Sequence, residues 1–133
     1  MSPARRIEAL SKNFRMEETQ LRSEGITSWE MIKELREEDL LSMVRIGNTS
    51  IRNYRKLQCM ANLICDIGIS NSEASLLIHS GIPSLNAIAA LSPSELIKRT
   101  TRLQLQLNIG RGQLINVSTA KAWIQKAKLA LTS

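Results

Sequence analysis

Residues 77–85 read Leu77-Ile-His-Ser-Gly-Ile-Pro-Ser-Leu85, and residues 21–29 read Leu21-Arg-Ser-Glu-Gly-Ile-Thr-Ser-Trp29. Both segments carry leucine, glycine, isoleucine and serine at the same places, and they lie 56 residues apart. The same shift aligns Leu35 with Leu91 and Leu40 with Leu96. A pattern that recurs at a fixed spacing indicates that one supersecondary unit occurs twice.

The match continues along the chain after an insertion of seven residues. Ile46-Gly47 then aligns with Ile109-Gly110, and three further residues bring Leu57 and Ala61 onto Trp123 and Ala127. We therefore predict a tandem duplication, with pseudo-repeats at roughly residues 10–66 and 67–133. Because the apolar face of each half is too small to be stable alone, the halves are expected to form a single helical domain over residues 1–133.

The composition favours an all-α fold. Glycine and proline number six and three, and strand-like alternation of polar and apolar residues is absent. Residues 48–65 show the helical pattern best, because Ile51, Tyr54, Leu57, Ala61 and Ile64 recur every three or four residues. Asn48 or Thr49 is the expected cap at the start of this helix.

The other expected helices follow from capping residues and apolar spacing. They cover about residues 4–23, a short segment capped by Ser28, 37–43, a segment capped by Ser72 that runs to Ser80, a segment capped by Ser84 that runs to Ala90, 93–105 with Pro93 at its first position, and 117–131.

Length and composition exclude several classes of protein. The chain has 133 residues, of which 43% are hydrophobic and 23% charged, so it is long enough for a real core. No apolar run approaches the roughly 20 residues that span a bilayer, so a membrane protein is excluded. No secretory signal is visible at the N-terminus, and the expected location is cytoplasmic.

Residues for metal binding and catalysis are scarce. Cys59 and Cys65 are the two cysteines and His79 is the one histidine, which is too few for a usual zinc site. We expect buried thiols and a histidine that caps or packs near a helix end. No nucleophile elbow, P-loop or dinucleotide fingerprint is present, so we expect no enzyme activity, no cofactor and no small-molecule substrate.

Charge is distributed unevenly along the chain. Residues 1–43 carry seven Lys/Arg and nine Asp/Glu, while residues 44–133 carry eleven and three, which gives net charges of −2 and +8. A surface of one sign attracts polyanions, of which nucleic acid is the default example. Solubility alone is the other explanation of such a charge.

Gly68-Ile69-Ser70 precedes Leu77 and resembles the loop of helix-hairpin-helix proteins, in which a Gly-hydrophobic-Gly hairpin precedes a helix. Ala74 then takes the small position that lets two helices approach. Residues 44–51, Val44-Arg-Ile-Gly-Asn-Thr-Ser-Ile51, are a second candidate in which Arg45 replaces the first glycine. Residues 108–112, Asn108-Ile-Gly-Arg-Gly112, are a third and looser one.

Over nearly its whole length the spacing resembles a family catalogued as domain of unknown function number four-three-three-two, which is common in photosynthetic prokaryotes. Residues 69–96 and 117–130 carry most of the likeness. The resemblance implies a fold of helix-hairpin-helix-like units and suggests DNA binding, without an activity to carry over.

A hairpin of this kind places backbone amides and a positive helix end against phosphate oxygens. The resulting hypothesis is a non-enzymatic protein that binds double-stranded DNA without sequence preference and more weakly at high salt. Its first group of candidate residues is Arg45, Gly47, Asn48, Thr49, Ser50, Arg52, Arg55 and Lys56. Because neither of the better hairpins keeps both glycines, a purely structural role is the alternative.

A second group of candidate residues is Lys98, Arg99 and Arg102, with Arg111 as a further candidate in the third hairpin. The alternative for Lys98, Arg99 and Arg102 is that they form a solvated helix face. The alternative for Arg111 is that it lies in a surface loop without a binding role. The aromatic residues Phe14, Trp29, Tyr54 and Trp123 are too few to provide stacking platforms, because the last three fall on apolar stripes. Duplex DNA is therefore favoured over single strands.

A protein-protein interaction or assembly module is the alternative function. Degenerate helical hairpins would then form a scaffold, and the basic face would dock an acidic protein partner. The acidic segment 34–39 of a second copy is one such partner. The sequence leaves the natural partner and the oligomeric state open.

Overall fold

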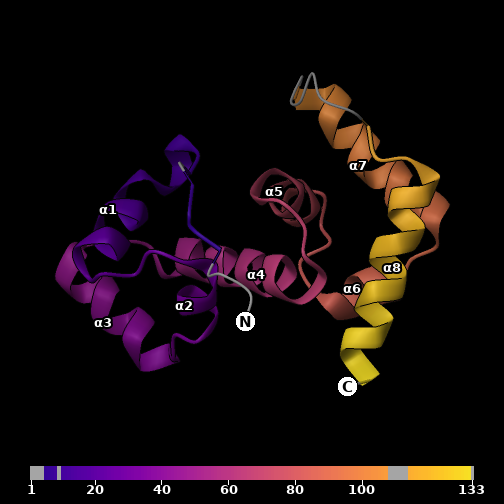
Figure 1. Ribbon diagram of the computed structural model, residues 1–133. Coiled ribbons are helices and arrows are strands. Elements are labelled where there is room, and N and C mark those ends of the chain that lie inside the picture. Colours follow the sequence, from indigo (N-terminus) through magenta and orange to yellow (C-terminus); the bar gives the residue numbers. More distant parts are fainter. Residues whose placement is uncertain (1–4, 9, 108–113, 133) are drawn as a thin grey trace. The chain divides into compact units, whose positions relative to one another are not determined.

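The computed structural model describes residues 5–8, 10–107 and 114–132. Within these ranges the protein consists of α-helices, one short 3-10 helix and one isolated β-bridge between Arg6 and Ser28, and it contains no β-strand (Figure 1). The all-α class predicted from the sequence is confirmed.

The chain divides into two compact units, Met1–Cys65 and Asp66–Ser133. This boundary lies one residue before the predicted boundary between the pseudo-repeats. The first unit contains the 3-10 helix η1 (Lys12–Phe14), α1 (Arg15–Ser23), α2 (Trp29–Lys33), α3 (Glu37–Gly47) and nearly all of α4 (Ile51–Ile67). The second unit contains α5 (Asn71–His79), α6 (Leu85–Ala89), α7 (Pro93–Leu107) and α8 (Val117–Thr132).

Helices of the two units occupy matching places in the sequence. α1, α2 and α3 begin 56 residues before α5, α6 and α7, and the ends of α1 and α2 follow the same spacing. The correspondence ends within α3 and α7, because α7 is four residues longer. Origin by tandem duplication stays a prediction, which this matching local structure supports.

The turn after the first helix of each unit depends on a glycine. Gly25 and Gly81 have φ angles of 74° and 81°, in the left-handed region that residues with a Cβ avoid. Beyond each glycine the chain folds back, so that Ile26 and Ile82 donate backbone hydrogen bonds of 2.9 Å to the carbonyls of Leu21 and Leu77. These bonds satisfy carbonyls that the helix end leaves free.

A serine then starts the second helix of each unit, as the sequence predicts. Ser28 accepts a hydrogen bond from the amide of Met31, and Ser84 accepts one from Ala87. A serine side chain at this position satisfies one of the amides that have no partner within the helix. Each turn therefore joins two helices with few free backbone groups.

Both units have cores made of the residues that the repeat aligns. Leu21, Ile32 and Leu40 of the first unit are buried, as are their counterparts Leu77, Ile88 and Leu96 of the second. In the second unit α8 packs against α6 and α7. The α8 residues that are buried are Ala120, Trp123, Ile124 and Ala127. The small alanines let the neighbouring backbones approach.

The N-terminal helix expected over residues 4–23 is wrong for the described residues before Lys12. Residues 5–8 are not helical but lie along the α1–α2 turn, where Ile7 donates to the carbonyl of Thr27 at 3.0 Å and Trp29 donates to that of Arg5 at 2.8 Å. The amide and guanidinium of Arg5 also donate to Glu30 at 2.8 and 2.6 Å. These long-range bonds override local helix propensity.

Two expected caps were also wrong by two residues or fewer. Ser70, not Ser72, starts α5, because Ser70 and Glu73 form a reciprocal capping box. Ser50, not Asn48 or Thr49, starts α4 and accepts a hydrogen bond of 3.2 Å from the amide of Asn53. Asn48 instead ends α3 in the left-handed conformation.

Acid is expected to release residues 5–8 from the α1–α2 turn. The amide of Arg5 is the largest cause that holds the pKa of Glu30 below its usual value of 4.5. Because the pKa of Glu30 is lower in the folded protein than in the unfolded chain, the ionised carboxylate stabilises the fold at pH values above the unfolded pKa. This stabilisation is lost as the pH falls through the pKa of the folded protein. NMR relaxation of the Ile7 amide should report increased motion below pH 4.5. Unchanged rigidity at a pH at which NMR shows the Glu30 carboxyl to be protonated would contradict this expectation.

Replacement of either turn glycine by alanine should destabilise the protein through the backbone alone. No atom lies within 4 Å of a Cβ built on Gly25 or Gly81, so the cost is the left-handed conformation, about 1–2 kcal/mol. Urea unfolding of Gly25→Ala and Gly81→Ala measures this loss. Asn48→Gly is the control, because glycine relieves the left-handed position at φ 51° and stability should not fall.

Candidate interaction surfaces

The loop between α3 and α4 contains the first group of predicted DNA-binding residues. Asn48 donates its amide to the carbonyl of Val44, and Thr49 donates its amide to the same carbonyl at 3.3 Å. The Thr49 hydroxyl donates to the carbonyl of Met43 at 3.1 Å. The loop therefore uses these donors to end α3, and none of the three points to an external acceptor.

A carboxylate of the same unit lies at the start of α4. Glu17, on α1, is buried with 3% of its surface exposed. It accepts hydrogen bonds of 3.0 Å from the amide of Ser50 and from the side-chain nitrogen of Asn53. An acidic group at a helix N-terminus is stabilised by the free amides and the helix dipole. Glu17 thus occupies the place that the hairpin mechanism reserves for a phosphate.

Gly47 has a packing role in this arrangement. It ends α3 with ordinary helical geometry, and a Cβ built on it would lie 2.7 Å from the side-chain carbonyl carbon of Gln20. Glycine here lets α1 and α3 approach closely, which is the packing role that the sequence left as the alternative. Sequence reasoning did not find the pairing of Glu17 with this loop, because the two segments are 33 residues apart.

The basic side chains around the loop differ in their availability. Arg45 and Arg52 are exposed, and neither has an ion-pair partner within the part of the chain that the structure describes. Arg55 pairs with Glu37, and Lys56 is half-buried. Arg45 and Arg52 are therefore exposed cations of this group for which the described part of the chain supplies no ion-pair partner.

The loop at Gly68 resembles the other loop in its hydrogen bonding. Gly68 has a φ of 69° and is exposed, but the amide of Ser70 donates to the Glu73 carboxylate of its own capping box at 2.9 Å. Ala74 is fully buried, as its predicted close-approach position requires. A carboxylate again lies beside the amide that would contact phosphate.

The third hairpin and Arg111 lie outside the described residues. The second basic group belongs to α7 of the second unit, whereas the first belongs to the α3–α4 region of the first unit. Lys98 and Arg102 are exposed, and Arg99 pairs with Glu95 at 3.3 Å. The basic half of the sequence thus supplies cations to both units.

α7 has an unusual distribution of residues between its two faces. Its buried face contains Leu96, Thr100 and Gln104, of which two are polar. The Thr100 hydroxyl is satisfied by the carbonyl of Leu96 at 3.0 Å. The opposite face exposes Leu105, with 72% of its surface accessible. A helix with apolar residues on both faces is typical of one that is covered on both sides.

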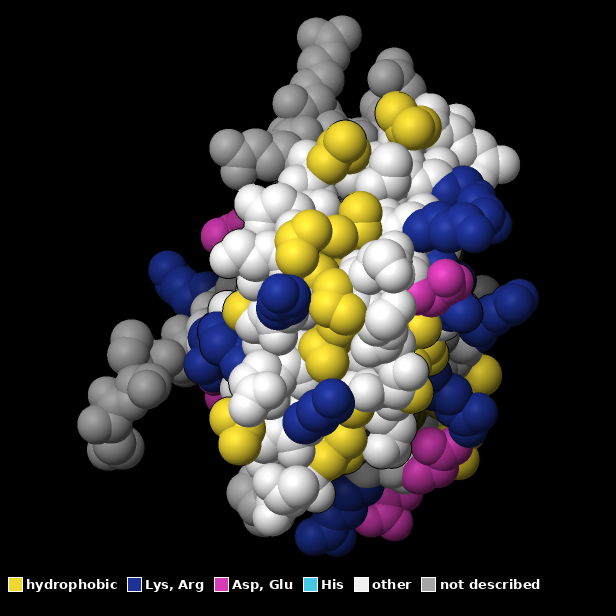
Figure 2. Space-filling view, turned by 90° about the vertical axis from the view of Figure 1, so that its right-hand side faces the viewer, with side chains coloured by type: hydrophobic (Ala, Val, Ile, Leu, Met, Phe, Trp, Pro, Cys, Tyr) yellow, Lys and Arg dark blue, Asp and Glu magenta, His cyan; other side chains and the backbone are white. Residues whose placement is uncertain are grey.

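The exposed face of α7 forms an open groove of about 740 Å³, lined by Pro93, Ser94, Ile97, Lys98, Thr101, Arg102, Leu105 and Val117. Pro93, Ile97, Thr101 and Leu105 recur every four residues and make its floor, while Ser94, Lys98 and Arg102 follow one position later and border it. Figure 2 shows a band of hydrophobic side chains with Lys and Arg beside it on the side of the second unit where α7 and α8 lie. The sequence identified the cations but not the groove, for which the spacing of four was the available signal.

The structure also describes the surroundings of the two cysteines and the one histidine. Cys59 and Cys65 are half-buried, and burial raises the pKa of the Cys59 thiol. His79 is exposed, and its Nδ1 lies 2.8 Å from the carbonyl of Ser75. Among the described residues no group of His, Cys, Asp or Glu is placed to hold a metal ion. No described helix is both long and apolar enough to cross a membrane.

Fold and surface define an all-α protein of two helical units that presents cationic and apolar helix faces. The chain belongs to the family described as Domain of unknown function (DUF4332), whose model matches residues 11–130. No curated protein and no solved structure matches the chain.

Removal of the Glu17 carboxylate should destabilise the first unit. Glu17→Ala leaves the Ser50 amide without its acceptor and leaves the Asn53 side chain with the Asn13 carbonyl as its remaining acceptor, which costs about 1–3 kcal/mol. Denaturant unfolding measures the loss. Glu18→Ala is the control, because its ion pair with Arg22 at 3.5 Å is worth about 0–1 kcal/mol at the surface. Equal losses in both variants would show that the buried carboxylate has no special role.

Proposed function

We propose that this protein is a non-enzymatic protein-interaction module whose binding surface is the α7 groove. The observation that carries this proposal is the row of Ile97, Thr101 and Leu105 along the groove, in which Leu105 and a further lining residue, Val117, are exposed. A contiguous apolar surface with a polar border is characteristic of interaction sites in water-exposed proteins.

The energetics support a protein partner. Burial of one exposed leucine-sized side chain contributes about 1.5–3 kcal/mol, and Leu105 and Val117 are 72% and 54% exposed. The groove runs along a helix of 15 residues, which matches the recognition mode in which a helix lies in a hydrophobic groove. Internal use of the loop amides by Glu17 and Glu73 favours this function over phosphate binding at the hairpins.

Site-specific photo-crosslinking tests the proposal. A photoreactive residue at Leu105 should form a covalent adduct with a discrete polypeptide in cells that express the protein, and mass spectrometry identifies it. The same residue at Gln125, an exposed polar position on α8, is the control. Adducts at both positions alike, or at neither, would contradict a protein-binding groove.

Sequence-tolerant binding of duplex DNA is the second candidate function. It is favoured by the exposed Arg45 and Arg52, which have no ion-pair partner among the described residues. All four aromatic residues are buried, with at most 4% exposed, so bases have no ring on which to stack and a duplex is the favoured form. In this candidate function side chains, not loop amides, contact the phosphates.

Fluorescence anisotropy of a labelled duplex tests DNA binding. If the two arginines contact phosphates, Arg45→Ala/Arg52→Ala should lower the salt slope by about two counterions between about 50 and 200 mM salt. Arg22→Ala/Arg36→Ala removes equal charge from two exposed arginines that are paired to acids, and it is the matched control. Equal effects of the two double variants would show that only overall charge attracts DNA.

A further inference from the structure

We propose that the occupant of the α7 groove is an amphipathic helix that carries acidic residues along one flank. This inference rests on the proposed protein-interaction function and specifies the chemistry of the partner. It follows from the length of the apolar floor, the sign of the charge at its border, and the use of the chain's own acidic residues elsewhere.

The floor of the groove fixes the size of the partner. From Pro93 to Leu105 it extends along α7 for about 18 Å, at 1.5 Å per residue. A helix of about three turns covers this distance and presents apolar side chains at positions i, i+3 or i+4, and i+7. A flat polar surface would leave Ile97 and Leu105 in contact with water.

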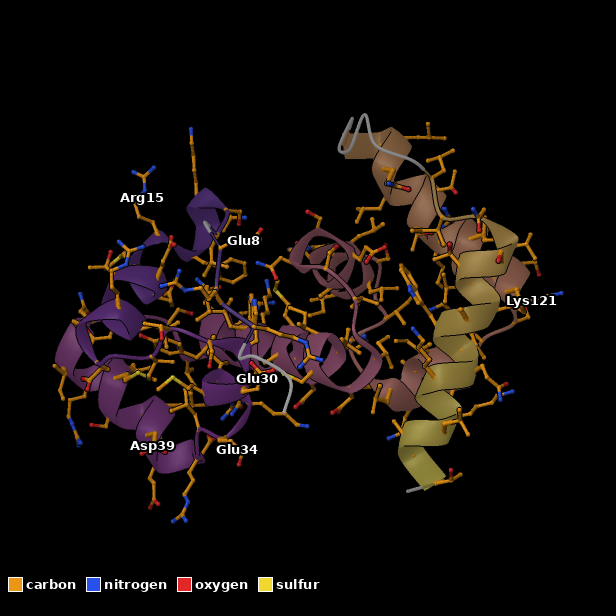
Figure 3. All side chains as sticks on the ribbon, viewed as in Figure 1. Glu8, Arg15, Glu30, Glu34, Asp39 and Lys121 are labelled. Carbon is orange, nitrogen blue, oxygen red and sulfur yellow. The ribbon has the colours of Figure 1, made fainter. Side chains whose placement is uncertain are left out.

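The border of the groove fixes the charge of the partner. Among the described residues Lys98 and Arg102 are its charged lining residues, and no described acid lines it. Neither cation has an ion-pair partner among the described residues, in contrast to Arg99, which Glu95 neutralises. Figure 3 shows Lys121 pointing outward from α8 of the same unit. Carboxylates on the partner complement these cations.

The acidic residues at the start of α3 already have partners within this chain. Glu37 pairs with Arg55, and Glu38 lies 3.6 Å from Arg36. Asp39 accepts a hydrogen bond of 2.8 Å from the Arg36 amide in the cap of α3. Figure 3 shows Glu34 and Asp39 on one side of the first unit, around α2 and α3. A second copy that docked through α3 would have to share these carboxylates with their present partners, whereas a separate partner brings carboxylates of its own, so we assign the groove to a separate partner.

Two labelled peptides test the inference on the full-length chain. One is a synthetic helix of about 18 residues with leucines every three or four positions and glutamates along one flank, and the other has lysine at each glutamate. Fluorescence anisotropy at about 50 mM salt should give at least tenfold tighter binding of the glutamate peptide. The double variant Lys98→Glu/Arg102→Glu should reverse this preference, and Ile97→Asp should abolish binding of both peptides.

A matched control separates the local charge from the total charge. Lys126→Glu/Lys128→Glu makes the same change in net charge at two exposed positions of α8 that do not line the groove. It should retain the preference for the glutamate peptide. Circular dichroism of every variant establishes that the fold is intact before binding is compared.

Each other outcome overturns a defined part of the inference. Equal binding of both peptides, lost in Ile97→Asp, would leave a protein-binding groove without charge selection. Failure of both peptides while Leu105 still forms its crosslink would contradict the acidic helix but not the proposed function. Failure of the crosslink as well would contradict both. Displacement of the peptide by anionic vesicles or duplex DNA, or a dimer in light scattering, would assign the groove to that occupant instead.

Discussion

The left-handed backbone at Gly25 and Gly81 is the constraint on which both units depend. At each glycine the chain leaves one helix, returns an isoleucine amide to a leucine carbonyl in that helix, and meets a serine that starts the next helix. The turn leaves little freedom in the direction of the second helix, because its backbone donors and acceptors are already used. The buried leucines and isoleucines of each unit then face a common core.

Local signals predicted the elements that depend on neighbours in the sequence. Ser28, Ser84 and Pro93 mark helix starts because capping and the fixed φ of proline act within one turn of chain. The 56-residue repeat anticipated the placement of six helices because it follows the same glycine turn and serine cap. These predictions needed no knowledge of contacts between distant residues.

Long-range partners explain what the sequence did not reveal. Residues 5–8 form hydrogen bonds with Thr27 and Glu30, and the Ser50 amide donates to Glu17. Neither set of bonds produces a periodic pattern in the sequence from which it could be predicted. The α7 groove was missed for a different reason. Thr100 and Gln104 occupy the buried face, so a rule that places polar residues outward assigns the wrong face to solvent. A helix with two apolar faces is recognised from accessible surface and not from hydrophobic spacing alone.

The start of α4 binds an anionic group, and that group is the Glu17 carboxylate of the same chain. A group held in the same chain acts at an effective concentration in the millimolar range or above, so a free phosphate has to compete with a carboxylate that is already in place. The first unit therefore uses the N-terminus of α4 to bind one of its own side chains, whereas such a helix end can also bind an external anion. Phosphate binding by the amides of this loop would require the loss of one acidic side chain on α1, and the same change would weaken the fold that presents the loop.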